Sequence, residues 1–420
     1  MFFLNNQERL HLSLKPFSFK LLIALITIKP FINSFWNNYI PLLNITFLQL
    51  SSILALIIMF FGLFKRSLEP IPSLASLIFG LFCISYFLNL FAVLIFNFDF
   101  NVIKLLAKVS IFPLSFYYCK NIINNELDFY IILNAFIKSI IPAMIIGIYD
   151  VYIVNSYAIT RNFIRYDSSF GDIANIGLHI NMVLLIMNYY FLNDKKNVIL
   201  GIDKSHLVFF IFSLIMLTKI SHGTSFAIFF AINGLFLLFK FSKNFFFTLL
   251  SSVIPLILVF IIFNDWISTF YQSFLSKEIN SILSGEFFTI SDKNDIKYLF
   301  HGRLGRWLIY LEEFSNLPNI IQYFGGYAVT KPWIFEHALH NDFLRLIFSL
   351  GYVGFFLYIL FIVYILIFSF KVKDISGKYL ILASIFLLLL YSITLTPTTY
   401  MDLSFMISTI SIYTLKKYKS

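Results

Sequence analysis

Two short polar runs of this chain contain the side-chain types that bind phosphate and transfer protons. The first, at 301–307, includes Arg303 and Arg306, and the second, at 337–345, includes His340. A guanidinium group offers a fixed fork of N–H donors that binds phosphate oxygens in two-pronged fashion and stays charged at any working pH. An imidazole titrates near neutrality, so it can take a proton from an attacking hydroxyl group. The two runs together predict a site for a diphosphate and a proton-transfer step.

The residues in and beside these runs have alternative interpretations that the sequence leaves open. Trp307 fits a platform for stacking a sugar, but it also fits an anchor at the membrane interface. Asn341 and Asp342 suit hydrogen bonds to a sugar or to the imidazole, and both residue types are also common at helix N-termini. Arg303 and Arg306 would equally suit contacts with anionic lipid headgroups. All five are therefore candidate site residues.

A metal site is the main chemical alternative for the second run. His337 and His340 have the spacing of one helical turn, and Glu336 and Asp342 lie beside them. No residues at fixed spacing elsewhere complete a ligand set, so we predict no metal. The sequence also contains no phosphate-binding loop motif, no GxGxxG and no GxSxG, so nucleotide-driven and acyl-serine chemistry have no support. No cofactor is expected.

Composition identifies lipid as the solvent in which this chain folds. Of its 420 residues, 59% are hydrophobic and only 12% are charged, whereas about a quarter are charged in soluble domains. The formal net charge is +10, but the Lys and Arg residues are scattered between apolar runs, so nucleic acid is not an expected partner. Cys83 and Cys119 lie inside apolar segments and form neither a disulfide framework nor a metal motif.

Apolar runs long enough to cross a bilayer as a helix recur along the chain. We expect an all-α polytopic membrane protein, one integral membrane domain over residues 1–420, with about 12 transmembrane helices of roughly 20 residues each. The predicted helices lie at 17–35, 42–64, 71–97, 101–120, 129–154, 173–193, 206–220, 223–240, 244–263, 344–370, 378–396 and 398–415.

The distribution of cations predicts the orientation of these helices. With the N-terminus in the cytoplasm, most loop cations fall on the cytoplasmic side, as the positive-inside rule requires. These cations are Lys65, Arg66, Lys120, Lys195, Lys196, Lys204, Lys240, Lys243, Lys371, Lys373, Lys378, Lys416, Lys417 and Lys419. The C-terminus is then also cytoplasmic, and the long polar segment 264–343 becomes a large periplasmic loop between the ninth and tenth helices. Arg161 and Arg165 lie on the outer side against this bias, which makes them candidates for substrate binding. We interpret Lys29, near an outer helix end, as a residue that snorkels to the headgroups.

These motifs resemble the bacterial O-antigen polymerase and O-antigen ligase superfamily of polytopic glycosyltransferases. Residues 302–307 read GRLGRW, which is similar to the GRxxxW-like run that opens the family's large periplasmic loop. Residues 340–344 read HNDFL and precede Gly351 and Gly354, which resembles the HNxxL and GxxG run that closes the loop. The outer segment that follows Arg165 resembles the family's Arg-containing stretch before its next span.

The resemblance, clearest over residues 160–365, implies a metal-independent glycosyl transfer at the periplasmic face of the bacterial inner membrane. A glycan on undecaprenyl pyrophosphate would be the donor. Arg303 and Arg165 would bind the leaving pyrophosphate with help from Arg306 or Arg161, and His340 would activate the acceptor hydroxyl group. Membrane lipid and a chain-length regulator are the further partners that the resemblance implies.

One position departs from the family's pattern. Many members carry Ser-Arg-Gly near the outer start of a span, where residues 221–223 of this chain read Ser-His-Gly. The cationic phosphate contact is then kept by His222 or Lys219, or supplied by Arg161 and Arg165. We include His222 among the expected substrate-binding residues.

The expected function is an O-antigen polymerase that joins lipid-linked oligosaccharide repeat units, because the run from His340 to Arg345 looks more like the polymerases. A ligase, which transfers glycan to lipid A core, differs in its acceptor and is the nearest alternative. A polytopic transporter or lipid flippase is the alternative of a different class. Transporters concentrate polar residues at the bilayer midplane on broken helices, whereas here they gather in one outer loop and its flanking helix ends.

Overall fold

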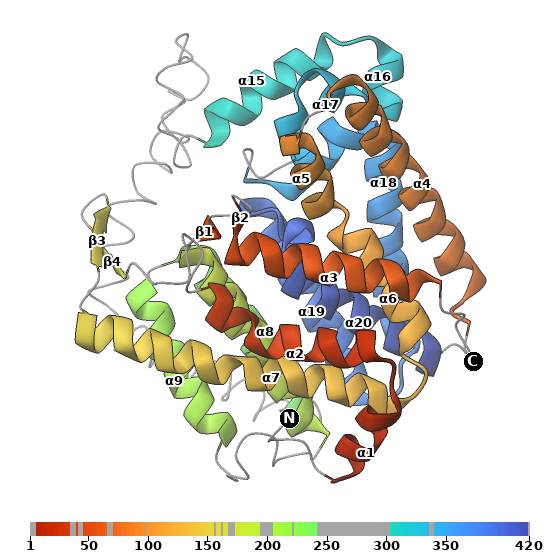
Figure 1. The fold of residues 1–420 in the computed structure, drawn as a ribbon. Helices are drawn as coiled ribbons and strands as arrows, with labels where there is room; N and C mark the ends of the chain where they lie inside the picture. Colours follow the sequence, from red (N-terminus) through yellow and green to blue (C-terminus); the bar gives the residue numbers. More distant parts are fainter. Residues whose placement is uncertain are drawn as a thin grey trace.

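A computed structural model shows a bundle of helices (Figure 1). It describes residues 6–33, 39–40, 45–64, 70–98, 100–154, 157–160, 163–166, 173–193, 205–220, 222–241, 303–335 and 340–418. The predicted helix 244–263 lies outside the described residues, as does the larger part of the predicted loop 264–343.

Helices make up nearly all of the regular structure in these ranges. The first part of the chain forms α1 (Asn6–Leu14), α2 (Phe17–Asn33), α3 (Phe47–Leu63), α4 (Ser73–Phe96), α5 (Phe100–Val109), α6 (Ile111–Ile122), α7 (Glu126–Tyr149), the π-helical turn η1 (Asp150–Val154), α8 (Ile173–Leu192), α9 (Ser205–Ile220) and α10 (Gly223–Phe241). The second part forms α15 (Arg303–Ser315), α16 (Asn319–Phe324), α17 (Tyr327–Thr330), the 3-10 turn η4 (Pro332–Phe335), α18 (Asp342–Lys371), α19 (Ile375–Thr394), the 3-10 turn η5 (Pro397–Thr399) and α20 (Met401–Lys417).

Two short hairpins interrupt the helices. Strand β1 (Tyr39–Ile40) pairs antiparallel with β2 (Ile45–Thr46), with Tyr39 opposite Thr46. Strand β3 (Tyr157–Thr160) pairs antiparallel with β4 (Phe163–Tyr166), with Tyr157 opposite Tyr166. The second hairpin lies in the predicted outer loop that contains Arg165.

The structure confirms a mainly helical, multi-pass membrane protein. Six described helices are long and apolar enough to cross a bilayer, and they span Ser73–Phe96, Glu126–Tyr149, Asn175–Leu192, Gly223–Phe241, Asp342–Lys371 and Ile375–Thr394. Every other predicted span within the described residues also coincides with one or two helices. The total of twelve spans stays a prediction.

Side chains of the sequence explain where several helices begin. Thr46 and Gln49 form a capping box at the start of α3, and the Asn125 side chain accepts a hydrogen bond from the Asp128 N–H at the start of α7. The carboxylate of Asp374 caps α19. Burial alone would raise the pKa of Asp374, but hydrogen bonds from the Ser376 hydroxyl, the Gly377 and Ser376 N–H groups and the Tyr418 hydroxyl hold that pKa below its usual range.

The single helix predicted at 101–120 is instead two helices, α5 and α6, that meet at Ser110. Pro113 explains this correction, because proline has no N–H group to bond the carbonyl of Val109 one turn earlier. The Tyr86 hydroxyl of α4 donates to that Val109 carbonyl instead, at 2.7 Å. A side chain from a neighbouring helix thus satisfies the backbone group that the proline leaves open.

Helix ends that are predicted to be cytoplasmic lie together at one end of the bundle. The Lys15 Nζ is 2.5 Å from the Asp128 carboxylate, which joins the start of α2 to the start of α7. The Lys417 Nζ is 3.2 Å from the Glu126 carboxylate, and Lys416 donates to carbonyl groups at the end of α6. These contacts agree with the alternating directions that the sequence predicts for α2, α6, α7 and α20.

Candidate active site

The segment 303–335 folds onto α18 through a small apolar cluster of its own. Phe314 of α15 and Phe348 of α18 are buried with their ring centroids 5.2 Å apart. Trp307 and Tyr310 pack against this cluster from α15, and Leu344 packs against it from the first turn of α18. The two polar runs that the sequence singles out therefore begin helices that share one cluster.

Contacts among Glu313, Tyr327 and Lys331 join α15 to α17 and to the residue that follows it. The Glu313 carboxylate accepts hydrogen bonds from the Tyr327 hydroxyl and from the Lys331 Nζ. Burial, and then the neighbouring Glu313 carboxylate, raise the pKa of Tyr327 above its usual range. The Lys331 Nζ also lies 5.5 Å from the centre of the Tyr310 ring, within cation–π distance. The α15–α17 segment is therefore a folded unit.

Asn89 of α4 and Asn97, the C-cap of α4, bind the backbone of this segment. The Asn89 side chain donates to the Phe324 carbonyl at 3.1 Å, and the Asn97 side chain donates to the Val329 carbonyl at 2.6 Å. Figure 1 shows α15, α16 and α17 together over one end of α4 and α18. This end is opposite to the end where the predicted cytoplasmic lysines gather.

Helix α18 is broken at Gly351, where the segment approaches it most closely. Gly351 has φ 70° and ψ 179°, a backbone conformation that is essentially restricted to glycine. A Cβ atom there would lie 2.5 Å from the Gly325 nitrogen and from the Tyr323 carbonyl oxygen. A Cβ atom at Gly354 would lie 2.7 Å from the Ser85 hydroxyl of α4. The two glycines of the closing motif thus permit close backbone packing.

His340 immediately precedes α18 in an unusual conformation. It is half-buried and has φ 47°, the only positive φ of a non-glycine residue in the described part of the chain. Asn341 caps the helix by accepting from the Leu344 N–H at 3.0 Å, and its amide donates to the Ile393 carbonyl of α19 at 3.2 Å. These contacts of Asn341 place the backbone of His340 beside the end of α19.

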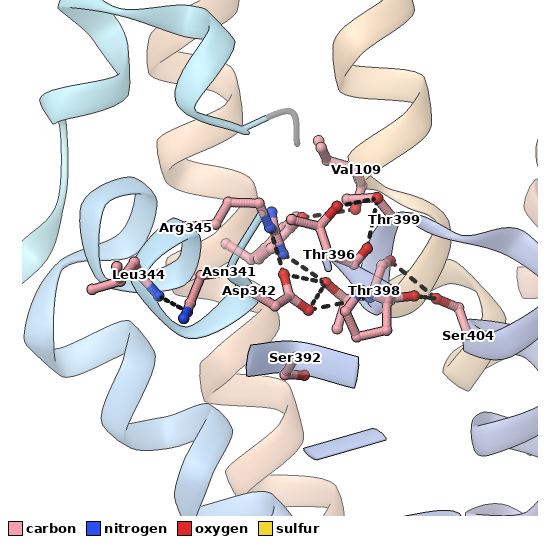
Figure 2. A network of polar contacts seen from close by, with 12 residues as sticks. Val109, Asn341, Asp342, Leu344, Arg345, Ser392, Thr396, Thr398, Thr399 and Ser404 are labelled. Carbon is pink, nitrogen blue, oxygen red and sulfur yellow. Dashed lines mark hydrogen bonds and ion pairs between the residues drawn. The ribbon is translucent and has the colours of Figure 1, made fainter. Parts of the chain in front are cut away.

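A fully buried ion pair lies in the first turn of α18, directly after His340 and Asn341 in the chain (Figure 2). The Arg345 Nε donates to one Asp342 carboxylate oxygen at 2.6 Å, and the Arg345 Nη2 donates to the Thr398 hydroxyl at 2.6 Å. The Thr398 N–H and hydroxyl both contact the Asp342 carboxylate, at 3.2 and 2.7 Å. Figure 2 shows Asp342 and Arg345 pointing from α18 toward η5. Both carboxylate oxygens of Asp342 accept hydrogen bonds from protein groups. These bonds favour a structural role for Asp342 over a contact with a sugar.

His222 belongs to a second polar network in the same part of the bundle. Its Nδ1 lies 2.7 Å from the Ser225 hydroxyl, which lies 3.0 Å from the Tyr391 hydroxyl of α19. The Asn181 amide of α8 donates to the Ser225 carbonyl at 2.9 Å. Strand β4, which carries Arg165, packs beside α9, whose end directly precedes His222 in the chain. His222 is therefore held at the start of α10, near the α19 end that also contacts Asn341.

A third polar contact lies at the start of α20. The Lys29 Nζ of α2 is buried 3.3 Å from the Asp402 carboxylate. Lys29 pairs inside the protein, so the prediction that it snorkels to headgroups is wrong. Nearby, the His179 Nε2 of α8 lies 2.8 Å from the Ser139 hydroxyl of α7. Intramembrane ionisable residues that pair in this way commonly mark functional sites.

Each of the three networks includes a residue between 391 and 402. We call this segment the 391–402 corner. Tyr391 contacts the His222 network, Thr398 contacts the Asp342 network, and Asp402 contacts Lys29. This corner is not among the sites predicted from the sequence. Its signal is the polar run Ser-Ile-Thr-Leu-Thr-Pro-Thr-Thr-Tyr-Met-Asp at 392–402, within an otherwise apolar stretch.

No protein-family profile matches the chain, and no curated protein matches its sequence significantly.

For some of the other predicted site residues, the structure describes the backbone position alone. The rest lie outside the described residues. Arg303 and Arg306 are in the first turn of α15, and Arg165 is in β4. Arg161 lies outside the described residues, as do His337 and Glu336 of the metal alternative. Among the described residues, no group of three or more His, Cys, Asp or Glu side chains is arranged to hold a metal ion. Convergence of the Arg303 guanidinium and the His340 imidazole stays a prediction.

Proposed function

We propose that this protein is an O-antigen polymerase, a metal-independent glycosyltransferase that uses glycans linked to undecaprenyl pyrophosphate. One observation carries the proposal. Trp307 and Leu344 pack on the same apolar cluster, so the Arg-containing run and the His-containing run begin neighbouring helices at one end of the bundle. The chemistry that the sequence predicts needs both side-chain types at one place.

The proposed reaction transfers a glycan from a diphosphate to a hydroxyl group. His340 takes the proton of the acceptor hydroxyl, whose oxygen then bonds to the anomeric carbon of the donor glycan. The bond from that carbon to the diphosphate oxygen breaks, and the diphosphate leaves with the bonding electrons. Arg303 and Arg165 neutralise the charge that develops on the leaving group, with Arg306 or Arg161 assisting. Such preorganised cations contribute most in the transition state.

We place this site at the periplasmic face of the inner membrane, with both termini in the cytoplasm. The end of the bundle that contains Lys15, Lys416 and Lys417 carries paired cations of the kind that the positive-inside rule assigns to the cytoplasm. The segment 303–335 lies at the opposite end, where an outer-leaflet lipid diphosphate would be accessible.

Replacement of Arg303 or His340 by Ala tests the proposal. Each variant should abolish long-chain surface polysaccharide in cells while the protein is still present in the membrane, because each removes a group that acts on the transition state. Lys373→Ala is the matched control, since Lys373 is an exposed cation just after α18, at its predicted cytoplasmic end. Full-length polysaccharide in the Arg303→Ala and His340→Ala strains would refute the assigned roles.

A transporter or lipid flippase is a second candidate, which the break of α18 at Gly351 and the buried Lys29–Asp402 pair favour. The glycan profile of a deletion strain separates the candidates. Lipid A core that carries a single repeat unit indicates a lost polymerase. Bare core with polymer on the carrier lipid indicates a lost ligase. Bare core with single repeat units held on the cytoplasmic side indicates a lost flippase.

A further inference from the structure

The backbone of His340 needs support from its surroundings. A φ of 47° is left-handed, and residues with a Cβ atom adopt this region only where the neighbouring structure determines it. The residue that follows, Asn341, is fixed on two sides by the Leu344 N–H and the Ile393 carbonyl. Asn341 thus ties the start of α18 to the end of α19.

The first turn of α18 is held by Thr398. The Thr398 hydroxyl accepts from the Arg345 Nη2 at 2.6 Å and donates its one hydrogen to the nearer Asp342 carboxylate oxygen at 2.7 Å, with the other oxygen at 3.0 Å. One hydroxyl group therefore joins a cation and an anion that are both fully buried. Hydrogen bonds between charged and neutral groups are strong in such surroundings.

Hydrogen bonds on both sides of Thr398 hold the turn η5 in place. The Ser404 hydroxyl of α20 donates to the Thr398 carbonyl at 3.0 Å, and the Thr399 hydroxyl donates to the Thr396 carbonyl at 2.8 Å. Both contacts are visible in Figure 2. The position of the first turn of α18 is thus set by η5, and η5 is set by α20.

We infer that Arg345, Asp342 and Thr398 form a positioning device for His340, which we call the Thr398 clamp. The inference rests on the proposed function, since it assigns the clamp to the reaction in which His340 accepts a proton. The clamp residues do not touch substrate. They fix the backbone from which the imidazole extends, and so they set the distance from the imidazole to the acceptor hydroxyl group.

Substitutions at Thr398 test the clamp. Thr398→Val keeps the shape of the side chain and removes the hydroxyl, whereas Thr398→Ser keeps the hydroxyl. Thr414→Val is the matched control, because Thr414 is a buried threonine of α20 whose hydroxyl bonds only within its own helix. The purified variants in nanodiscs are compared for kcat and KM with lipid-linked repeat units, and for amide hydrogen exchange of residues 340–346.

We expect Thr398→Val to lower kcat by about 100-fold, the effect of misplacing a catalytic group by about 1 Å, with KM nearly unchanged. Exchange at 340–346 should become faster in the same variant. Thr398→Ser should retain most of the turnover, and Thr414→Val should behave like the wild type. Where Thr398→Val yields little monodisperse protein, Thr398→Ala removes the same hydroxyl without the bulk of a second methyl group beside Asp342.

Three results would overturn the clamp. Wild-type kcat and wild-type exchange in Thr398→Val would show that the hydroxyl does not hold the first turn of α18. Faster exchange with wild-type kcat would reduce the network to a purely structural role. Wild-type turnover in His340→Ala would remove the proposed base and with it the catalytic role of the clamp. Only this last result also counts against the proposed function.

Discussion

Replacing Gly351 by Ala should destabilise the folded protein by about 2 to 6 kcal/mol, from two separate costs. The backbone conformation at φ 70° and ψ 179° is open only to glycine, and forcing another residue into it costs about 1 to 3 kcal/mol. The new Cβ atom would also lie 2.5 Å from backbone atoms of Gly325 and Tyr323, which cannot rotate away as a side chain can. Overpacking of this kind costs roughly 1 to 3 kcal/mol more.

The assay is the heating midpoint of the purified protein in detergent, read as the loss of the monodisperse peak on size exclusion. Because membrane proteins often unfold irreversibly, all variants are compared at one heating rate. Gly234→Ala is the control, since Gly234 lies inside α10 with no atom within 4 Å of a new Cβ atom. This variant should keep or raise the midpoint, because Ala is favoured over Gly in a helix by roughly 0.5 to 1 kcal/mol.

A Gly351→Ala protein with the heating midpoint of the wild type would refute the reasoning. It would mean that α18 continues through position 351 or that residues 323–325 do not pack there. The same result would weaken the proposed site, because the segment that carries Arg303 reaches α18 partly through this contact.

The remaining predictions concern buried and capping charges. Asp342→Leu and Arg345→Met should each lower the free energy of unfolding by about 3 to 5 kcal/mol, because each leaves an unpaired buried charge. The heating midpoint of the double variant should fall by less than the sum of the falls in the two single variants. The pKa of Asp374 is lowered in the folded protein, so its contribution is fully present above its unfolded value of about 3.9 and is lost as pH falls through the lower folded value. The difference in heating midpoint between wild type and Asp374→Asn should therefore shrink below about pH 4, and a constant difference down to pH 2 would contradict the assigned shift.

Hydropathy alone locates the helices well. The predicted spans at 71–97 and 173–193 match α4 and α8 closely, since a run of apolar residues in lipid must satisfy its backbone within one helix. The predicted single helix at 101–120 differs from the structure because hydropathy averages over Ser110 and Pro113, which lie within a mainly apolar run. The hydroxyl group that bonds the freed Val109 carbonyl belongs to Tyr86 on another helix, so the sequence near Pro113 does not indicate it.

The candidate site is only partly readable from the sequence. His340 and Asn341 were found because their residue types and their place before an apolar run suggest chemistry or a cap, and Asn341 is indeed the cap. Arg345 had a local signal, since it follows Asp342 with the spacing of one helical turn. Its second partner, Thr398, lies in the polar run 392–402, but nothing in that run indicates Arg345, because the contact joins residues 53 positions apart through the packing of three helices.

The long-range ion pairs of the bundle constrain the order in which it can be assembled. Ribosomes deliver the N-terminal helices first, so Lys29 reaches the bilayer well before Asp402 has been synthesised. Until then its ammonium group lacks its carboxylate partner and has to stay near water. Helix α20 supplies the anion for Lys29 at one end and a cation for the exposed Glu126 carboxylate at the other. Insertion of α20 therefore provides the partner of the buried Lys29, and a chain that ends before α20 would leave that charge without Asp402.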